Sequence, residues 1–327
     1  MGQSTKEIVR RIKSIGNTKK ITKAMELVSA AKMRKSVEAT LASRFYAKYS
    51  WEVLTKLAAV TDPSQHALLA VRPVKKLCVL LITSDKGLCG SYNSLIIKKI
   101  LQQLKDPKSM MANRVLDKKI EATIDPKDLE VTFICIGKKG AEVVQKLGKK
   151  VAAVFTGLSE RPKVRELAPV ADIIISDYIA GKYDKIVSAY TDYFSVIKQV
   201  PKLRQLLPIS KIDLEKLISE LDTVYDKVKD ERFNHVAIDQ QAEYVFEPNK
   251  KQLLNEILED LVKMQIYQMV MESRASENSS RMVAMKNASD AAGDMIGELT
   301  LIYNKARQAS ITQEIAEISS GKAALES

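Results

Sequence analysis

One glycine-bounded segment, Ser84–Gly90 (SDKGLCG), comes nearest in this chain to the residue types and spacing of a reactive or ligand-binding site. It follows an apolar run and precedes a stretch with helical periodicity, which is where a phosphate-binding loop lies in an α/β domain. The segment matches neither GxxxxGK[ST] nor GxGxxG, and the Gly137–Gly140 segment (GKKG) is equally incomplete. A tight turn that needs glycine at positive φ explains the same residues, and we favour it over nucleotide binding.

Cys89 is the candidate nucleophile within this segment. A reactive thiol needs a neighbouring base, and neither His66 nor His235 lies in a suggestive context. The carboxylates that could act as acids, bases or metal ligands form no recognisable pair or cluster: Asp85, Asp172 and Asp177. We therefore expect Cys89 to be a small buried turn residue, the carboxylates to be solvated or capping groups, and the chain to have no catalytic, cofactor or metal site.

Composition narrows the class of protein. Of the 327 residues, 46% are hydrophobic and 28% are charged, which suits a folded protein with a buried core. The apolar runs are short, such as Leu77–Ile82, and none approaches the ~18–20 residues that cross a membrane. The cysteines are Cys78, Cys89 and Cys135, an odd number without CxxC spacing, which argues against a disulfide scaffold and a structural zinc site.

Positive charge is concentrated at the N-terminal end. The net charge is +12, and residues 1–60 hold 13 Lys/Arg against 4 Glu, a balance of +9. Such a segment faces nucleic acid, an acidic lipid surface or an acidic protein partner, unless it is simply a solvated helix face.

The nine prolines divide the chain, because all of them lie between Pro63 and Pro248. Proline breaks helix interiors at a cost of about 3 kcal/mol, so the two proline-free ends predict long terminal helices. We assign residues 1–60 and 248–327 to these coiled-coil helices, residues 70–210 to a central domain, and residues 211–247 to a helical connection.

The C-terminal end carries a heptad repeat typical of a coiled coil. Twelve of sixteen successive a and d positions are apolar. The series is Ile257, Leu261, Met264, Gln268, Met271, Ala275, Asn278, Met282, Met285, Ser289, Ala292, Ile296, Leu299, Tyr303, Ala306 and Ser310.

The N-terminal end has a looser stripe. Ile8, Ile12 and Ile15 keep helical spacing, and we expect a phase shift near Gly16 with the stripe resuming at Ile21, Met25 and Val28. Two terminal helices with complementary stripes pack most simply as an antiparallel pair.

The middle of the chain alternates strands and helices. Strands are predicted at 75–83, 131–136 and 151–155, and each is followed by a helix, at 91–104, 138–147 and 168–179. This order predicts a mostly parallel, Rossmann-like α/β sheet. Segments 185–197 and 202–208 suit an antiparallel pair at the sheet edge, where proline is tolerated. We expect 106–130 to be a loop and 209–240 to be helical.

Three motifs in order along the chain resemble the γ subunit of bacterial-type F-type ATP synthases. The first is Arg11–Arg34, the second is Ser84–Gly90, and the third runs from Ser280–Ala291 to Tyr303–Ile318. The resemblance implies an antiparallel coiled coil of the two termini with an inserted α/β domain. It also implies a central rotor that couples proton flow to ATP synthesis at the β subunits and carries no active site itself.

The family resemblance further implies partners and a location. The coiled coil is expected inside the hexamer of α and β subunits, and the α/β domain against the ε subunit and the c-subunit ring. The complex would hold the chain peripherally at the cytoplasmic side of the cell membrane. Basic side chains would meet acidic loops of the β subunits. The expected partner-contact residues are Lys19, Lys20, Lys23, Met25, Arg281, Arg307, Gln308, Thr312 and Glu317.

Two other classes remain as alternatives from the residues alone. The basic N-terminal segment is compatible with a nucleic-acid-binding coiled-coil protein, although it lacks interleaved aromatics before Phe45. The α/β middle is compatible with a nucleotide-using enzyme. A gel shift that weakens with salt would favour the first class, and binding of ATP or NAD would favour the second.

Overall fold

The computed structural model describes residues 5–60, 66–115, 118–120, 128–209 and 250–326. It divides into two units, one of residues 1–30 and 281–327 and the other of residues 31–280. The predicted helical connection at 211–247 lies outside the described residues.

A five-stranded sheet forms the centre of the second unit, in the order β5-β4-β1-β6-β7. Its strands are β1 (Lys76–Ile82), β4 (Glu130–Ile136), β5 (Lys150–Phe155), β6 (Lys185–Tyr193) and β7 (Gln199–Leu207). The first four are mutually parallel, and β7 pairs antiparallel with β6 at the edge. The predicted parallel sheet with an antiparallel edge pair is confirmed.

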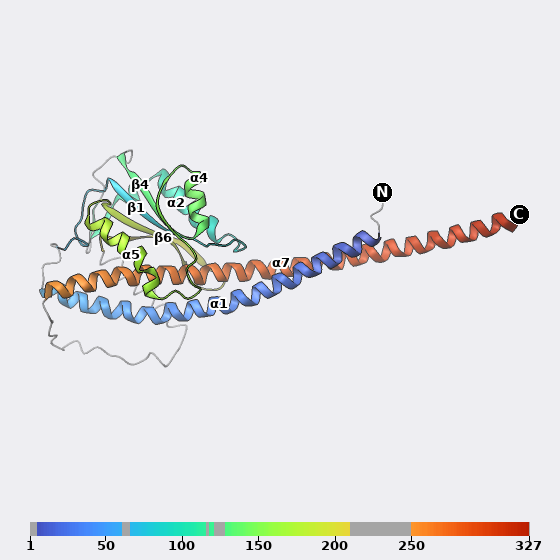
Figure 1. Cartoon of the computed structure of the whole chain (residues 1–327), viewed down its shortest axis with the longest axis horizontal. Coiled ribbons are helices and arrows are strands. Elements are labelled where there is room, and N and C mark those ends of the chain that lie inside the picture. Colours follow the sequence, from blue (N-terminus) through green and yellow to red (C-terminus); the bar gives the residue numbers. More distant parts are fainter. Residues whose placement is uncertain (1–4, 61–65, 116–117, 121–127, 210–249, 327) are drawn as a thin grey trace. The chain divides into compact units, whose positions relative to one another are not determined.

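Helices cover both faces of this sheet (Figure 1). The helices α2 (Tyr92–Lys105) and α4 (Lys138–Lys146) pack on one face, and α5 (Val164–Ile179) packs on the other together with the first part of α7. Alternation along β1 explains the two cores, because Leu77, Val79 and Leu81 enter the first while Cys78, Leu80 and Ile82 enter the second.

Part of the predicted loop at 106–130 has regular structure, which corrects that expectation. It contains the short helix α3 (Lys108–Met111) and the paired strands β2 (Asn113–Val115) and β3 (Lys118–Ile120). These elements are too short for hydrophobic periodicity to reveal them.

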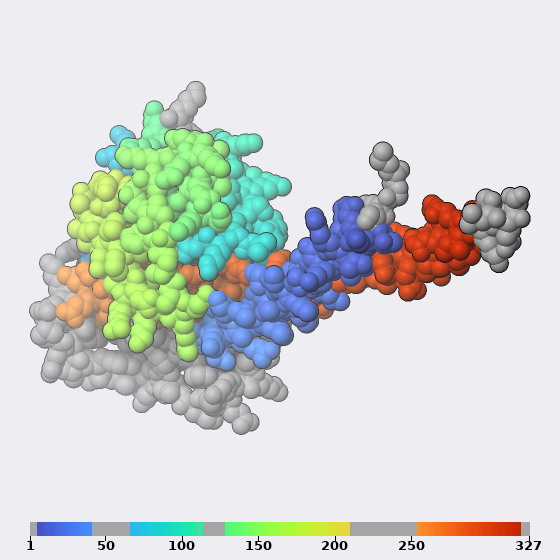
Figure 2. Space-filling view, turned by 45° about the vertical axis from the view of Figure 1, so that its right-hand side comes forward, coloured from blue at the N-terminus to red at the C-terminus, as the bar shows by residue number. Residues whose placement is uncertain are grey.

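The terminal helices are α1 (Thr5–Val60) and α7 (Lys250–Glu326). In the first unit, the beginning of α1 runs antiparallel to α7, which continues beyond it toward the C-terminus (Figures 1 and 2). Every heptad position predicted from Met282 to Ala306 is buried or half-buried, so the register of the C-terminal repeat is confirmed there.

The predicted phase shift in α1 is wrong. Ile21 and Val28 are 60% and 52% exposed, whereas the small residues Thr22 and Ser29 are buried. The spacing that begins at Ile8 therefore continues unbroken. A prediction from apolar residues alone places the stripe wrongly, because this contact uses small polar residues that allow the helices to approach closely. The Thr22 hydroxyl keeps a partner when buried, since it donates to the carbonyl oxygens of Thr18 and Lys19 in its own helix.

Candidate functional site

The Ser84–Gly90 turn is built from polar side chains that bond to one another. Asn93, the second residue of α2, donates from Nδ2 to Ser84 Oγ at 2.7 Å and to Cys89 Sγ at 3.2 Å. Ser84 Oγ donates to the carbonyl oxygen of Lys86 at 2.7 Å. Cys89 is 3% exposed, so the expectation of a buried turn residue is confirmed.

Asp85 lies at the N-terminus of α4, where an anion would otherwise find backbone donors. Its Oδ1 accepts the backbone N–H of Lys138, the first residue of α4, at 3.1 Å. Its Oδ2 accepts the N–H of Gly157, after β5, at 3.1 Å. A carboxylate from the chain itself thus satisfies donors at a helix N-terminus, where anions bind favourably. The turn after β1 is thus tied to the segments that follow β4 and β5, and a carboxylate of the chain occupies the N-terminus of α4.

The other carboxylates proposed for chemistry have ordinary surroundings. Asp177 pairs with Lys182 at 2.7 Å, and Asp172 is exposed on α5. Across the described ranges, no group of three His, Cys, Asp or Glu side chains is placed to hold a metal ion.

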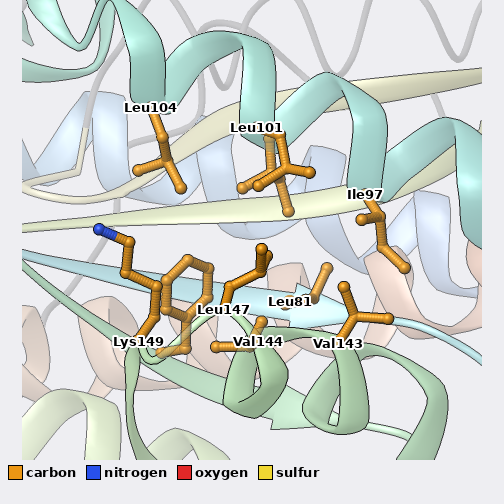
Figure 3. Close-up of a pocket in the computed structure, with 10 residues that line it drawn as sticks. Leu81, Ile97, Leu101, Leu104, Val143, Val144, Leu147 and Lys149 are labelled. Atoms are coloured by element: carbon orange, nitrogen blue, oxygen red, sulfur yellow. The ribbon is translucent and has the colours of Figure 1, made fainter.

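A narrow pocket between α2 and α4 is apolar (Figure 3). Leu101 and Leu104 line it from α2, and Val143 and Leu147 line it from the other side. Lys149 is the one charged residue of its lining, so the pocket offers no pair of groups for acid–base or nucleophilic chemistry.

The predicted cations of α1 lie on the surface of the first unit. Lys19, Lys20 and Lys23 are all exposed, and Lys23 pairs with Glu26 at 2.9 Å. Met25 and Arg281 are half-buried on α1 and α7. These residues therefore form a surface of mixed basic and apolar character.

The remaining predicted contact residues lie where α7 is not covered by the described chain. Every residue from Arg307 to Gly321 is exposed. Thr312 Oγ1 donates to the carbonyl oxygen of Gln308 at 2.9 Å, and Glu317 accepts from Gln313 Nε2 at 2.9 Å. At 100° per residue, the predicted residues here (Arg307, Gln308, Thr312 and Glu317) surround the helix and do not share one face.

Sequence reasoning missed the apolar side chains of this same stretch. Ile311, Ile315 and Ile318 are 48%, 60% and 74% exposed. Their i, i+4, i+7 spacing places them on one face of α7, and such a stripe is typical of a helix that packs on something else. The spacing is present in the sequence, but none of these three isoleucines is a position of the heptad series.

Comparisons with known proteins agree on one family. The family model described as ATP synthase matches residues 4–325. A protein of Dehalococcoides mccartyi named ATP synthase gamma chain is 37% identical over 320 residues, covering 97% of this chain and 98% of the relative. A protein of the same name from Pelotomaculum thermopropionicum is 36% identical over 323 residues, covering 99% of both chains.

Solved structures share the fold at lower identity. A chain of the Euglena gracilis mitochondrial ATP synthase is similar with a TM-score of 0.61 and 18% identity, covering 98% of this chain and 94% of that chain. A central-stalk chain of the Tetrahymena thermophila mitochondrial ATP synthase has a TM-score of 0.54 and 22% identity, covering 82% of this chain and 99% of that chain.

Proposed function

Because the chain belongs to the ATP synthase gamma-chain family, whose members are the central stalk subunits of F-type ATP synthases, we propose that it works as a rotor. Rotation of the stalk couples ion flow through the membrane to ATP synthesis or hydrolysis at the β subunits. The chain contributes no catalytic group and no cofactor, and the catalytic residues belong to the β subunits.

The observation that carries this proposal is the exposed end of α7. Residues 307–321 form a single helix with an apolar stripe of Ile311, Ile315 and Ile318 that no described part of the chain covers. A lone helix of this kind gains little stability by itself and needs a surrounding partner. In this family, the partner that surrounds such a helix is the central cavity of the α–β hexamer.

The contacts proposed for the hexamer are those that the family resemblance implies. Lys19, Lys20 and Lys23 meet acidic loops of the β subunits, and Met25 and Arg281 lie at that contact. The hexamer also forms hydrogen bonds with the contact residues on the exposed C-terminal part of α7, which are Arg307, Gln308, Thr312 and Glu317.

The α/β domain is proposed to contact the ε subunit and the c-subunit ring. None of the described helices has the length and apolar character needed to span a membrane. We propose that the chain is held at the cytoplasmic side of the cell membrane through these subunits, with residues 1–60 and 248–327 as the stalk helices and 70–210 as the domain between them.

Affinity purification of the tagged chain from its source cell tests this function. Mass spectrometry should find α and β ATPase subunits in the eluate, and recovery of the chain without them would contradict the proposal. Ile315→Lys places a charge in the apolar stripe and should reduce the recovered hexamer several-fold. Ser310→Lys adds the same charge elsewhere on the exposed helix and is the matched control.

A further inference from the structure

Strand β6 extends further than the strand beside it. The pairing of β1 with β6 ends at Leu81 opposite Ala189, but β6 continues to Tyr193 along β7. Beyond Ala189, the side of β6 that faces away from β7 has no strand partner in this sheet. Backbone groups on that side need partners from elsewhere.

Serine side chains of α7 supply those partners. The N–H of Thr191 donates to Ser273 Oγ at 3.3 Å, and its carbonyl oxygen accepts from Ser276 Oγ at 3.2 Å. The residue opposite Thr191 on β7 is Pro201, which has no N–H to donate. Two helix hydroxyls therefore occupy the positions that a neighbouring strand would fill.

The same row continues to the turn between β6 and β7. Ser279 Oγ donates to the carbonyl oxygen of Val196 at 2.7 Å and accepts from Gln199 Nε2 at 3.3 Å. Ser280 Oγ donates to Gln199 Oε1 at 3.1 Å. We call Ser273, Ser276, Ser279 and Ser280 the serine row, and the first three are at most 2% exposed.

The serine row differs in kind from the α7 contacts that precede it. Between Leu254 and Val270, α7 buries apolar side chains in the core shared with α5 and the sheet. Apolar burial is not directional, so a helix can turn about its axis while keeping much of it. Hydrogen bonds weaken steeply when their angles change, so bonds over two successive turns hold the helix at one rotational setting.

Segments close to the serine row also contact the two long helices. Tyr193 at the end of β6 donates to Met33 Sδ of α1 at 3.8 Å. The loop after β5 pairs Glu160 with Lys32 of α1, and its Leu158 carbonyl accepts from Arg274 of α7 at 3.4 Å. Both long helices are thus held by the end of β6 and by the loop after β5.

We propose that the serine row fixes the rotational setting of α7 on the α/β domain and passes torque between them. The proposal rests on the rotor function, because a rotating stalk needs a contact that resists twist. Ser273, Ser276 and Ser279 are positioning residues, since they act through the helix and touch no nucleotide.

The contact itself is tested in the full-length chain by distances between two spin labels. One label is placed at Ile197→Cys, which is 90% exposed on the turn, and the other at Asp260→Cys, which is exposed on α7. The native cysteines are at most 3% exposed and should stay unlabelled. The S273A/S276A/S279A variant should broaden the distance distribution at least twofold, because alanine keeps the packing and removes the bonds.

The control for this experiment is S310A/S320A, which removes two exposed serines from the same helix. Its distribution should match that of the unsubstituted chain. An unchanged distribution in the serine-row variant would overturn the proposal, and the single variant S279A should show a smaller broadening if the bonds act together.

Torque transfer is tested in vesicles that contain the assembled complex. The serine-row variant should keep ATP hydrolysis within about twofold while ATP-driven proton uptake per ATP falls at least twofold. Loss of hydrolysis and uptake in equal proportion would mean that the serines serve assembly alone, which contradicts the proposal. Failure of the unsubstituted chain to join the complex would instead contradict the proposed rotor function. The label distances would still test the serine row in that case.

Discussion

Lys19 of α1 lies over Gly293 of α7, so that a Cβ atom built on Gly293 would come within 2.9 Å of the Lys19 Nζ. The glycine leaves room for the lysine to cross the helix contact and present its ammonium group beside α7. One of the cations proposed to meet the β subunits is therefore positioned by both terminal helices, although it belongs to α1.

Gly293→Ala tests how strongly this contact depends on glycine. The atom that the new methyl group meets is the flexible end of Lys19, which can move aside. Alanine favours the helix interior over glycine, so the free energy of unfolding should rise by about 0.5–1 kcal/mol. Urea denaturation followed by circular dichroism measures it, and a loss of stability would show that Lys19 is fixed in place.

Gly137→Ala should have the opposite effect. Gly137 has φ +95°, and a Cβ there would lie 2.2 Å from the backbone oxygen of Thr83. The backbone cannot move aside as the Lys19 side chain can, and the strained φ alone costs about 1–3 kcal/mol. The same denaturation experiment should show a lower midpoint, and an unchanged midpoint would contradict the geometry of this turn.

Cys89→Ala tests whether the Ser84–Gly90 turn does chemistry. The Cys89 thiol contacts Asn93 and has no histidine beside it among the described residues. ATP hydrolysis by the assembled complex should stay within about twofold, which corresponds to less than ~0.4 kcal/mol in the barrier. A hundredfold loss with normal assembly would restore Cys89 as a catalytic candidate.

His66 gives a prediction for pH. Burial lowers the pKa of His66, although Asn255 and Glu259 on α7 oppose the shift, and its Nδ1 accepts the N–H of Leu68 at 3.1 Å. The unfolded chain then binds the proton more tightly, so stability falls as pH drops below about 6.5 toward the folded-state pKa.

His66→Gln should reduce this loss of stability between about pH 7 and pH 5. Urea midpoints of both proteins across that range measure the difference. His235 is common to both proteins and cancels in the comparison. Parallel pH profiles would show that His66 does not contribute.

Met25→Lys tests the proposed contact with the β subunits. Met25 is half-buried on α1, beside Lys23 and Glu26. An added cation can form an ion pair with an acidic loop. At a partly buried contact, the interaction free energy of this pair can exceed the 0–1 kcal/mol of a surface ion pair and hold one rotary position too strongly. Hydrolysis should persist while proton uptake per ATP falls in membrane vesicles. An unchanged ratio with normal assembly would show that this position does not transmit rotation.

The sequence predicted the features of this fold that depend on periodicity. The heptad positions from Met282 to Ala306 are correct because the two helices bury every third or fourth residue whatever its identity. The strands around the Ser84–Gly90 turn are correct because buried parallel strands need continuous apolar runs.

Features that depend on close approach and hydrogen bonding were predicted only in part. Thr22 and Ser29 replace Ile21 and Val28 in the helix contact because small side chains fit there. Asp85 was expected to be a solvated or capping group, and its bond to Lys138 N does cap α4. Its second bond, to Gly157, depends on loops that meet only after the sheet has formed.

Rotation of the chain inside the α–β hexamer tests the central claim most directly. Ile197→Cys offers an exposed attachment point for a visible probe, since the native cysteines are buried. With the hexamer fixed to a surface and ATP added, the probe should turn in one direction and pause once for each β subunit. A probe that stays still or diffuses in both directions while the hexamer hydrolyses ATP would contradict the assignment of this chain as the rotor.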